Sequence, residues 1–256
     1  MLSMKPTRAR TGLRRFAFLC LAVCCYAQLS AFGQGSAGSP PSASTSDSLM
    51  ILQAFYQGDE NCPSVAIVKA AIATFGYPGV YAAAPVDDGQ RTKFLLRDGS
   101  SIEIADTDLE HGKTAAKFVS NYPAANKQIA DQAATLYALM ISRMVALSKP
   151  DNAFRGIKLL AQAELLLSGN MLDAEGHPRT VAASDLPVLL GLKSTPLTYR
   201  APLAYVHTNG FHAAFATGKL FDQEGTPTRL WKFDLHHGKI NHPHLTLNNS
   251  DFMLSQ

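Results

Sequence analysis

Residues 63–75, Pro-Ser-Val-Ala-Ile-Val-Lys-Ala-Ala-Ile-Ala-Thr-Phe, limit the possible folds more than any other segment of the chain. Beyond the first turn only Lys69 and Thr74 are polar. A helix with this composition has no polar face to turn toward water, so it is buried on all sides. Pro63 suits the first position of such a helix and Gly76 suits its C-terminal end. We therefore expect a central buried helix with the rest of the domain packed around it.

The N-terminal stretch has the layout of a secretory signal peptide. Its basic part has no acidic residue and contains Lys5, Arg8, Arg10, Arg14 and Arg15. An apolar run over residues 16–27 and then small residues follow, so we expect cleavage after Gly33 or after Ala27. Residues 1–33 are thus predicted to be a signal peptide, and the protein is predicted to be secreted to the periplasm or outside the cell.

Residues 34–48 are rich in Gly, Ser and Pro and contain almost nothing to bury, which predicts a disordered linker. Order is expected to begin near Leu49. Residues 49–256 are enough for one domain with a substantial hydrophobic core.

The charge of the chain excludes some classes of partner. The whole chain carries a net charge of +3, and five of its positive charges lie in the predicted signal peptide, so the remainder has a net charge near −2. This gives no reason to expect binding to nucleic acid. After the signal peptide no apolar run reaches the roughly 20 residues that span a bilayer, so no transmembrane segment is expected.

The order of predicted elements favours an α+β fold, because helices come first and strands last. A β-hairpin is expected around Asp98-Gly99, followed by a helix that starts with a capping box at Thr107 and Glu110. The later helices and strands are expected in this order: helices over residues 125–147 and 154–167, then strands over residues 204–207, 212–217, 228–234 and 244–247.

Cys62 is the only cysteine that remains after the signal peptide is removed, since the other three, Cys20, Cys24 and Cys25, lie within it. A single thiol in an exported chain has no intramolecular disulfide partner, so it is either buried and inert or kept for its reactivity. The thiolate is the reactive form, and the positive end of a helix dipole favours it. The position of Cys62 at the start of a helix predicts a nucleophile.

A cysteine nucleophile needs a base, a group that orients the base and donors for the oxyanion. His212 opens an apolar strand after Asn209-Gly210 and is the candidate base. Asp234, at the end of a later strand, is the candidate orienting group, with Asp222 and Asn209 as alternatives. Gln57, five residues before Cys62, is the candidate oxyanion donor.

Gln57, Cys62 on a buried helix, a helical middle and then His212-Ala-Ala-Phe on a late sheet together resemble the papain-like cysteine peptidases, especially their calpain-like branch. The resemblance covers roughly residues 49–240. It implies an α+β fold with a helical lobe over residues 49–195 and a β lobe over residues 196–256, with the active cleft between the lobes. It also implies cleavage of peptide bonds in a protein or peptide substrate.

The predicted function is therefore a secreted cysteine hydrolase that acts on peptide or amide bonds, and the same groups can also catalyse transamidation or glutamine deamidation. The alternative is a catalytically inactive papain-like module that binds a partner. No cofactor is expected. A third hypothesis is metal binding by the C-terminal histidines, but their spacing matches no fixed zinc pattern and a polar loop is the simpler interpretation: His236, His237, His242 and His244.

Overall fold

The computed structural model divides the chain into two units, residues 1–38 and residues 39–256, and the residues that it describes belong to the second unit. They are residues 45–57, 62–77, 79–86, 89–120, 123–197, 204–209, 212–229 and 251–256. The predicted signal peptide, the tail histidines and Asp234 lie outside the described residues. Of Gln57, Cys62, Asn209 and His212 the backbone is described.

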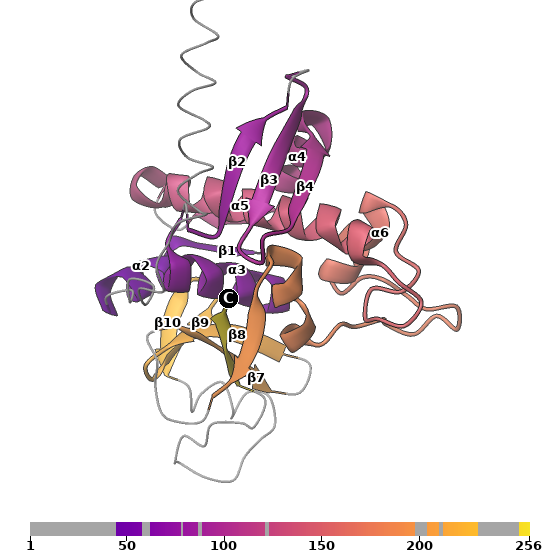
Figure 1. Ribbon diagram of the computed structural model, residues 1–256. Helices are drawn as coiled ribbons and strands as arrows, with labels where there is room; N and C mark the ends of the chain where they lie inside the picture. The colour runs from indigo at the N-terminus through magenta and orange to yellow at the C-terminus, as the bar shows by residue number, and fades with distance from the viewer. Residues whose placement is uncertain are drawn as a thin grey trace, which may run out of the picture. The chain divides into compact units, whose positions relative to one another are not determined.

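The fold is α+β with antiparallel sheets, as the order of the predicted elements indicated (Figure 1). The first half of the domain consists of α2 Thr45–Ala54, β1 Phe55–Gln57, α3 Cys62–Phe75, β2 Tyr81–Pro85, β3 Arg91–Leu96, β4 Ser101–Ala105, α4 Asp106–Ala115, β5 Phe118–Ser120 and α5 Pro123–Leu147. The second half consists of α6 Leu160–Leu167, the 3-10 helices η1 Ala183–Asp185 and η2 Pro187–Leu190, β6 Lys193–Pro196, β7 Tyr205–Asn209, β8 His212–Thr217, β9 Leu220–Gln223, β10 Thr226–Arg229 and β11 Phe252–Ser255.

The largest sheet has six strands in the order β10-β9-β8-β7-β11-β6, and every neighbouring pair is antiparallel. A second sheet has the order β2-β3-β4, and a third consists of β1 and β5. In Figure 1, α3 lies between the strands β7 to β10 on one side and α5 with the sheet β2-β3-β4 on the other.

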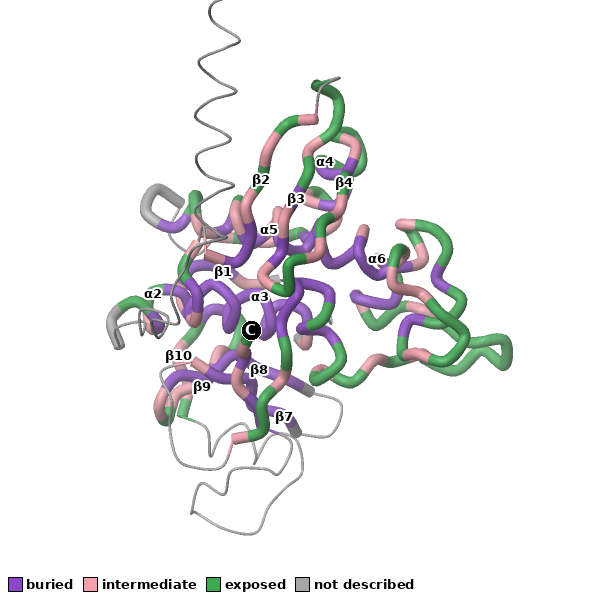
Figure 2. Tube along the Cα trace, viewed as in Figure 1, coloured by how far each residue is buried: buried purple, intermediate pink, exposed green. Residues whose placement is uncertain are grey.

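Helix α3 is the centre of the core, as its composition predicted. Its residues from Ser64 to Ala73 are all at most 8% exposed, and Figure 2 shows it buried along its length. It packs on β8, β7 and β11 of the large sheet and on α2 and α5. Gly76 ends the helix in the left-handed conformation, with φ +66°, and its N–H donates to the carbonyl of Ile72.

One hydrophobic core contains side chains from both the helices and the large sheet. It contains Ile67 of α3, Leu136 of α5, Phe215 of β8 and Phe252 of β11. A smaller cluster around Tyr205 lies on the other face of the large sheet. Within the described residues the helices and the large sheet therefore form one packed body.

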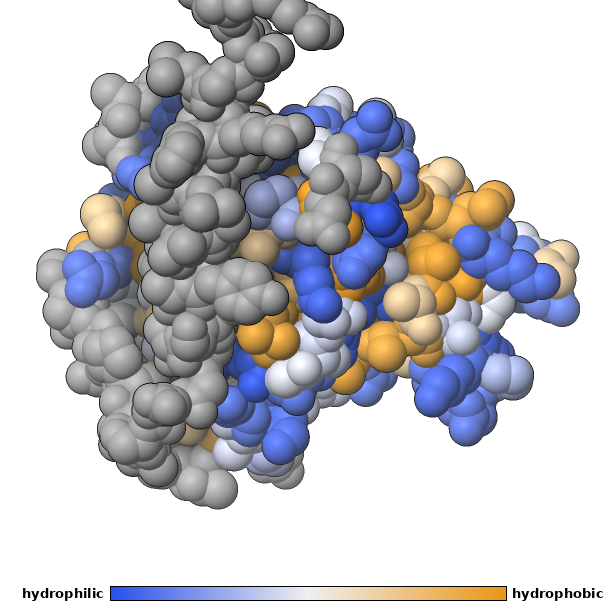
Figure 3. All heavy atoms as spheres, turned by 45° about the horizontal axis from the view of Figure 1, so that its top comes forward, coloured by the Kyte–Doolittle hydropathy of each residue, from blue (hydrophilic) through white to orange (hydrophobic). Residues whose placement is uncertain are grey.

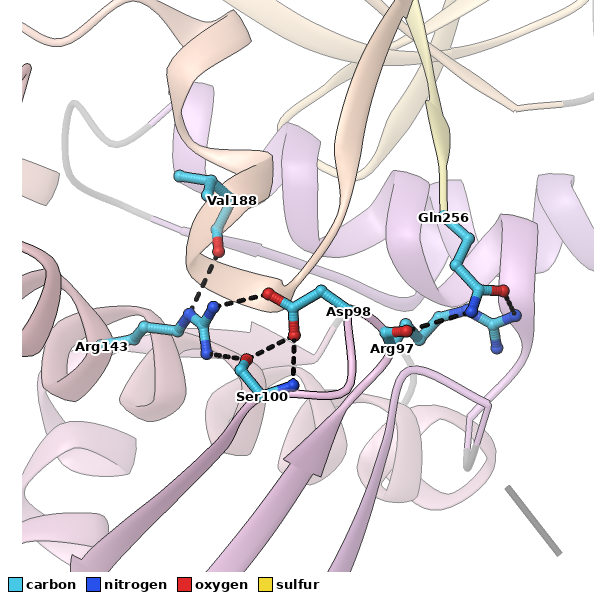
Figure 4. A network of polar contacts seen from close by, with 6 residues as sticks. All are labelled: Arg97, Asp98, Ser100, Arg143, Val188 and Gln256. Atoms are coloured by element: carbon cyan, nitrogen blue, oxygen red, sulfur yellow. Dashed lines mark hydrogen bonds and ion pairs between the residues drawn. The ribbon is translucent and has the colours of Figure 1, made fainter. Parts of the chain in front are cut away.

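The hairpin β3–β4 is fixed by a buried arginine of α5 (Figure 4). Arg143 donates to Asp98 Oδ2 at 2.7 Å, to the carbonyl of Val188 at 3.2 Å and to Ser100 Oγ. Burial acts to raise the pKa of Asp98, but hydrogen bonds from Ser100 and the charge of Arg143 outweigh it and hold this pKa below its usual value. The predicted turn at Asp98-Gly99 is thus confirmed and is tied to α5 and η2.

Several element ends differ from the predictions. Helix α2 begins at Thr45, four residues before the expected start of order. The predicted capping box of α4 is wrong, because α4 begins at Asp106 after Ala105 and no side chain caps it. Instead, Asp106 and Asp108 in its first turn interact favourably with the positive end of the helix dipole. Helix α6 is shorter than expected and begins at Leu160, since a turn precedes it.

Apolar side chains are also exposed near α6. Leu159, Leu165 and Leu172 are between 46% and 62% exposed. Figure 3 shows apolar side chains gathered on the side of the molecule where α6 lies. Among the described helices none is both long enough and apolar enough to span a bilayer.

The contact between α4 and α5 gives a first prediction. A Cβ at Gly112 would lie 2.7 Å from Cβ of Ala138 on α5. Gly112→Ala is therefore expected to lower the free energy of unfolding by about 1–3 kcal/mol. On an open helix face the same change would instead raise the free energy of unfolding, by at most about 1 kcal/mol. Urea unfolding followed by circular dichroism measures the difference. The neighbouring Lys113→Ala is the control, and a stabilised Gly112→Ala protein would contradict the close approach.

Candidate functional site

Cys62 is the first residue of α3, where the sequence predicted it. The helix dipole places a partial positive charge at this end, and the first N–H groups have no partner within the helix. Both effects favour a thiolate over a thiol at such a position. The backbone thus places Cys62 at the positive end of a helix dipole.

His212 is the first residue of β8, also as predicted. The register of β7 and β8 pairs it directly with Asn209. Helix α3 packs on β8, so the element that begins with Cys62 contacts the element that begins with His212. The structure therefore brings the two predicted elements together in one core.

Gln57 is the last residue of β1 and is paired with Phe118 of β5. Strand β1 also contacts α3. Gln57 therefore lies at the end of a strand, a few residues before the start of α3.

The sheet order changes the interpretation of the third residue. The predicted strand over residues 228–234 is not a neighbour of the strand of His212, because β9 lies between β8 and β10. A turn at Gly218 and Lys219 connects β8 to this additional short strand, which the sequence did not predict. Strands β8 and β10 run in the same direction, since both are antiparallel to β9. Arg229 therefore ends β10 at the far end of the sheet from His212.

Asp222, an alternative third residue, forms a buried ion pair with Lys69 of α3. The distance from Lys69 Nζ to Asp222 Oδ2 is 2.6 Å, and the two side chains are 0% and 7% exposed. Asp222 Oδ1 accepts the N–H of Gly225 at 2.7 Å. Both carboxylate oxygens of Asp222 thus have partners inside the core.

The environment of this pair is apolar. Lys69 Nζ also donates to the carbonyl of Leu52 at 2.7 Å and lies 4.7 Å from the centre of the Phe55 ring. Burial lowers the pKa of Lys69 and raises the pKa of Asp222, while their mutual attraction acts in the opposite direction on both. The pair ties α2, α3 and β9 together inside the core.

A second buried polar pair was missed by the sequence analysis. His207 Nδ1 lies 2.9 Å from Asp251 Oδ2, and the other carboxylate oxygen accepts the N–H of Thr208 at 2.9 Å. The side chains of His207 and Asp251 are 3% and 0% exposed. The sequence feature that could have indicated this pair is Asp251, an acidic residue directly before the apolar run Phe-Met-Leu near the C-terminus.

Asp251 lies further into the sheet than His212. Phe252 is opposite Val206 of β7, and Val206 is opposite Phe215 of β8, so β11 begins three residues further along the sheet than His212. The pair His207–Asp251 therefore ties the middle of β7 to the residue that precedes β11.

Two hollows are lined by described residues. One, of about 550 Å³, lies along α4 and α5 and is lined by Tyr77, Lys113 and Gln132 among others. The other, of about 600 Å³, lies beside the end of α5 and the start of β6. Among the described residues no group of three or more His, Cys, Asp and Glu side chains is arranged to hold a metal ion.

Comparison of the chain with protein-family models, with curated proteins and with solved structures gives no match.

The buried ion pair gives a second prediction. Lys69→Met leaves Asp222 buried without its cation, and Asp222→Asn leaves Lys69 without its anion, so each is expected to cost roughly 3–5 kcal/mol of unfolding free energy. The double variant removes both charges and keeps an acceptor for Gly225, so it is expected to regain most of this loss. Urea unfolding of all four proteins measures the coupling.

The exposed pair Lys127–Asp131 supplies the control, since Lys127→Met is expected to change stability by less than about 0.5 kcal/mol. If either single variant at the buried pair is as stable as the wild type, the pair does not hold α3 to β9.

Proposed function

We propose that the protein is a secreted cysteine hydrolase that acts on peptide or amide bonds, with Cys62 as nucleophile and His212 as base. The observation that carries this proposal is that α3, which begins with Cys62, packs on β8, which begins with His212. The resemblance of Gln57, Cys62 and His212-Ala-Ala-Phe to the papain-like order supports it. Export through residues 1–33 is part of the same proposal.

The chemistry follows from these roles. His212 accepts the proton of the Cys62 thiol, and the thiolate attacks the carbonyl carbon of the substrate. The negative charge that develops on the carbonyl oxygen is stabilised by N–H donors at the start of α3 and by the Gln57 amide. The C–N bond then breaks as His212 returns the proton to the leaving amine. Water hydrolyses the thioester and regenerates Cys62.

The third residue is better assigned to Asn209 than to Asp234. The register pairs Asn209 with His212, and directly opposed residues of antiparallel strands have Cβ atoms about 4.5–5.5 Å apart. An amide oxygen at that distance can accept the imidazole N–H and fix its tautomer. The described part of β10 ends at Arg229, at the end of the sheet opposite His212, and Asp234 lies outside the described residues.

The reactivity of Cys62 tests the proposal. At pH 6, iodoacetamide is expected to alkylate Cys62 at least about tenfold faster than a free cysteine of pKa near 8.5, because the helix terminus and His212 favour the thiolate. His212→Ala is expected to remove this advantage. Mass spectrometry of the peptide that contains Cys62 measures the rate as a function of pH.

His177→Ala is the matched control, since the His177 side chain is 77% exposed and distant in sequence from both residues. The alternative is a papain-like binding module without catalysis. It would be supported if alkylation of Cys62 began only above pH 8 and had the same rate in the wild type and in His212→Ala.

The third residue is tested by comparing Asn209→Ala with Asp234→Ala. Replacing the residue that orients His212 is expected to lower the alkylation rate of Cys62 at pH 6 by about ten- to a thousandfold. The other variant is expected to react at the wild-type rate. Asn209→Asp should recover part of the rate, because a carboxylate also accepts the imidazole N–H. A loss confined to Asp234→Ala would return the role to Asp234.

A further inference from the structure

Among the described strands β6 lies at one edge of the large sheet, and the register shows which of its backbone groups point outward. It pairs with β11, with Pro196 opposite Phe252, and the N–H of Leu197 donates to the carbonyl of Asp251 at 2.9 Å. Hydrogen-bonded pairs alternate along an antiparallel ladder. Thr195 therefore directs its backbone groups toward β11, and Ser194 directs its N–H and C=O away from the sheet.

The hollow of about 600 Å³ lies beside this edge. Its apolar lining is formed by Leu147, Phe154, Val188 and Leu192, and Ser194 also lines it. The side chain of Val188 is 42% exposed. An apolar side chain that enters the hollow would cover this exposed surface.

The rim of the hollow is positively charged. Lys149 and Lys193 line it and are exposed, and Asp185 is the one acidic residue among its described lining residues. Within the part of the chain that the structure describes, neither lysine forms an ion pair. The charge of the rim complements an acidic partner.

We propose that the edge of β6 and this hollow bind an extended acidic peptide segment, which adds to the sheet as a further strand. The N–H and C=O of Ser194 hydrogen-bond to the peptide, an apolar side chain enters the hollow, and acidic side chains contact Lys149 and Lys193. Pro196 has no N–H to donate, so the added strand is short. The site is independent of Cys62 and serves to hold a peptide, not to cleave it.

The test uses the full chain with Cys62→Ala, so that no cleavage interferes and failure of the proposed hydrolase activity leaves the result interpretable. Fluorescence anisotropy is measured with a labelled peptide of alternating valine and glutamate. Ser194→Pro removes the outward N–H without breaking a bond to β11 and is expected to weaken binding at least about fivefold. Ser194→Ala keeps the N–H and is expected to bind as the parent does.

The charge is tested separately. The double variant Lys149→Glu, Lys193→Glu is expected to bind the valine–glutamate peptide about tenfold or more weakly than the parent. It is expected to bind a peptide of alternating valine and lysine more tightly than the parent does. Lys219→Glu, an exposed lysine in the turn between β8 and β9, is the matched control and is expected to have no effect. Circular dichroism confirms that each variant is folded.

Equal binding of the peptide to Ser194→Pro and to Ser194→Ala would overturn the proposal, as would a preference of the parent for the lysine peptide. A dimer in solution that Ser194→Pro dissociates would also overturn it, because β6 would then pair with β6 of a second copy.

Discussion

The burial of α3 is the constraint on which the rest of the structure depends. A helix that is apolar on all sides must be covered on all sides, because each large aliphatic side chain left in water forfeits about 1.5–3 kcal/mol. The large sheet covers one side of α3, and α2 and α5 cover others. The helix that begins with Cys62 is therefore packed against both the large sheet and other helices.

Two polar pairs are built into this core, and both connect elements that carry candidate site residues. Lys69–Asp222 joins α3 to β9, the neighbour of β8, and His207–Asp251 joins β7 to the start of β11. A buried charge without its partner costs more than the pair contributes, so each pair penalises any arrangement in which its two elements are separated. These pairs restrict how α3 and β8 can lie relative to each other.

The surface of the large sheet offers a different kind of site. Its edge strand β6 is short and contains Pro196 and Lys193, features that limit uncontrolled pairing with other chains. The N–H and C=O of Ser194 point away from β11, and Ser194 lines an apolar hollow. A site that binds an extended segment there would hold a peptide at a position separate from Cys62 and His212 along the sequence.

The sequence alone determined the buried helix of residues 63–75, its end at Gly76, the hairpin at Asp98-Gly99 and the strand that begins at His212. These depend on local patterns, namely apolar periodicity, a left-handed glycine and turn residues, that are readable within a few positions. The tertiary structure decided the sheet order, the insertion of β9 between β8 and β10, and the pairing of Asn209 with His212. It also decided that Lys69 meets Asp222, 153 positions away, and that His207 meets Asp251. Such contacts depend on which strands are neighbours and in which direction they run, and no local pattern encodes either.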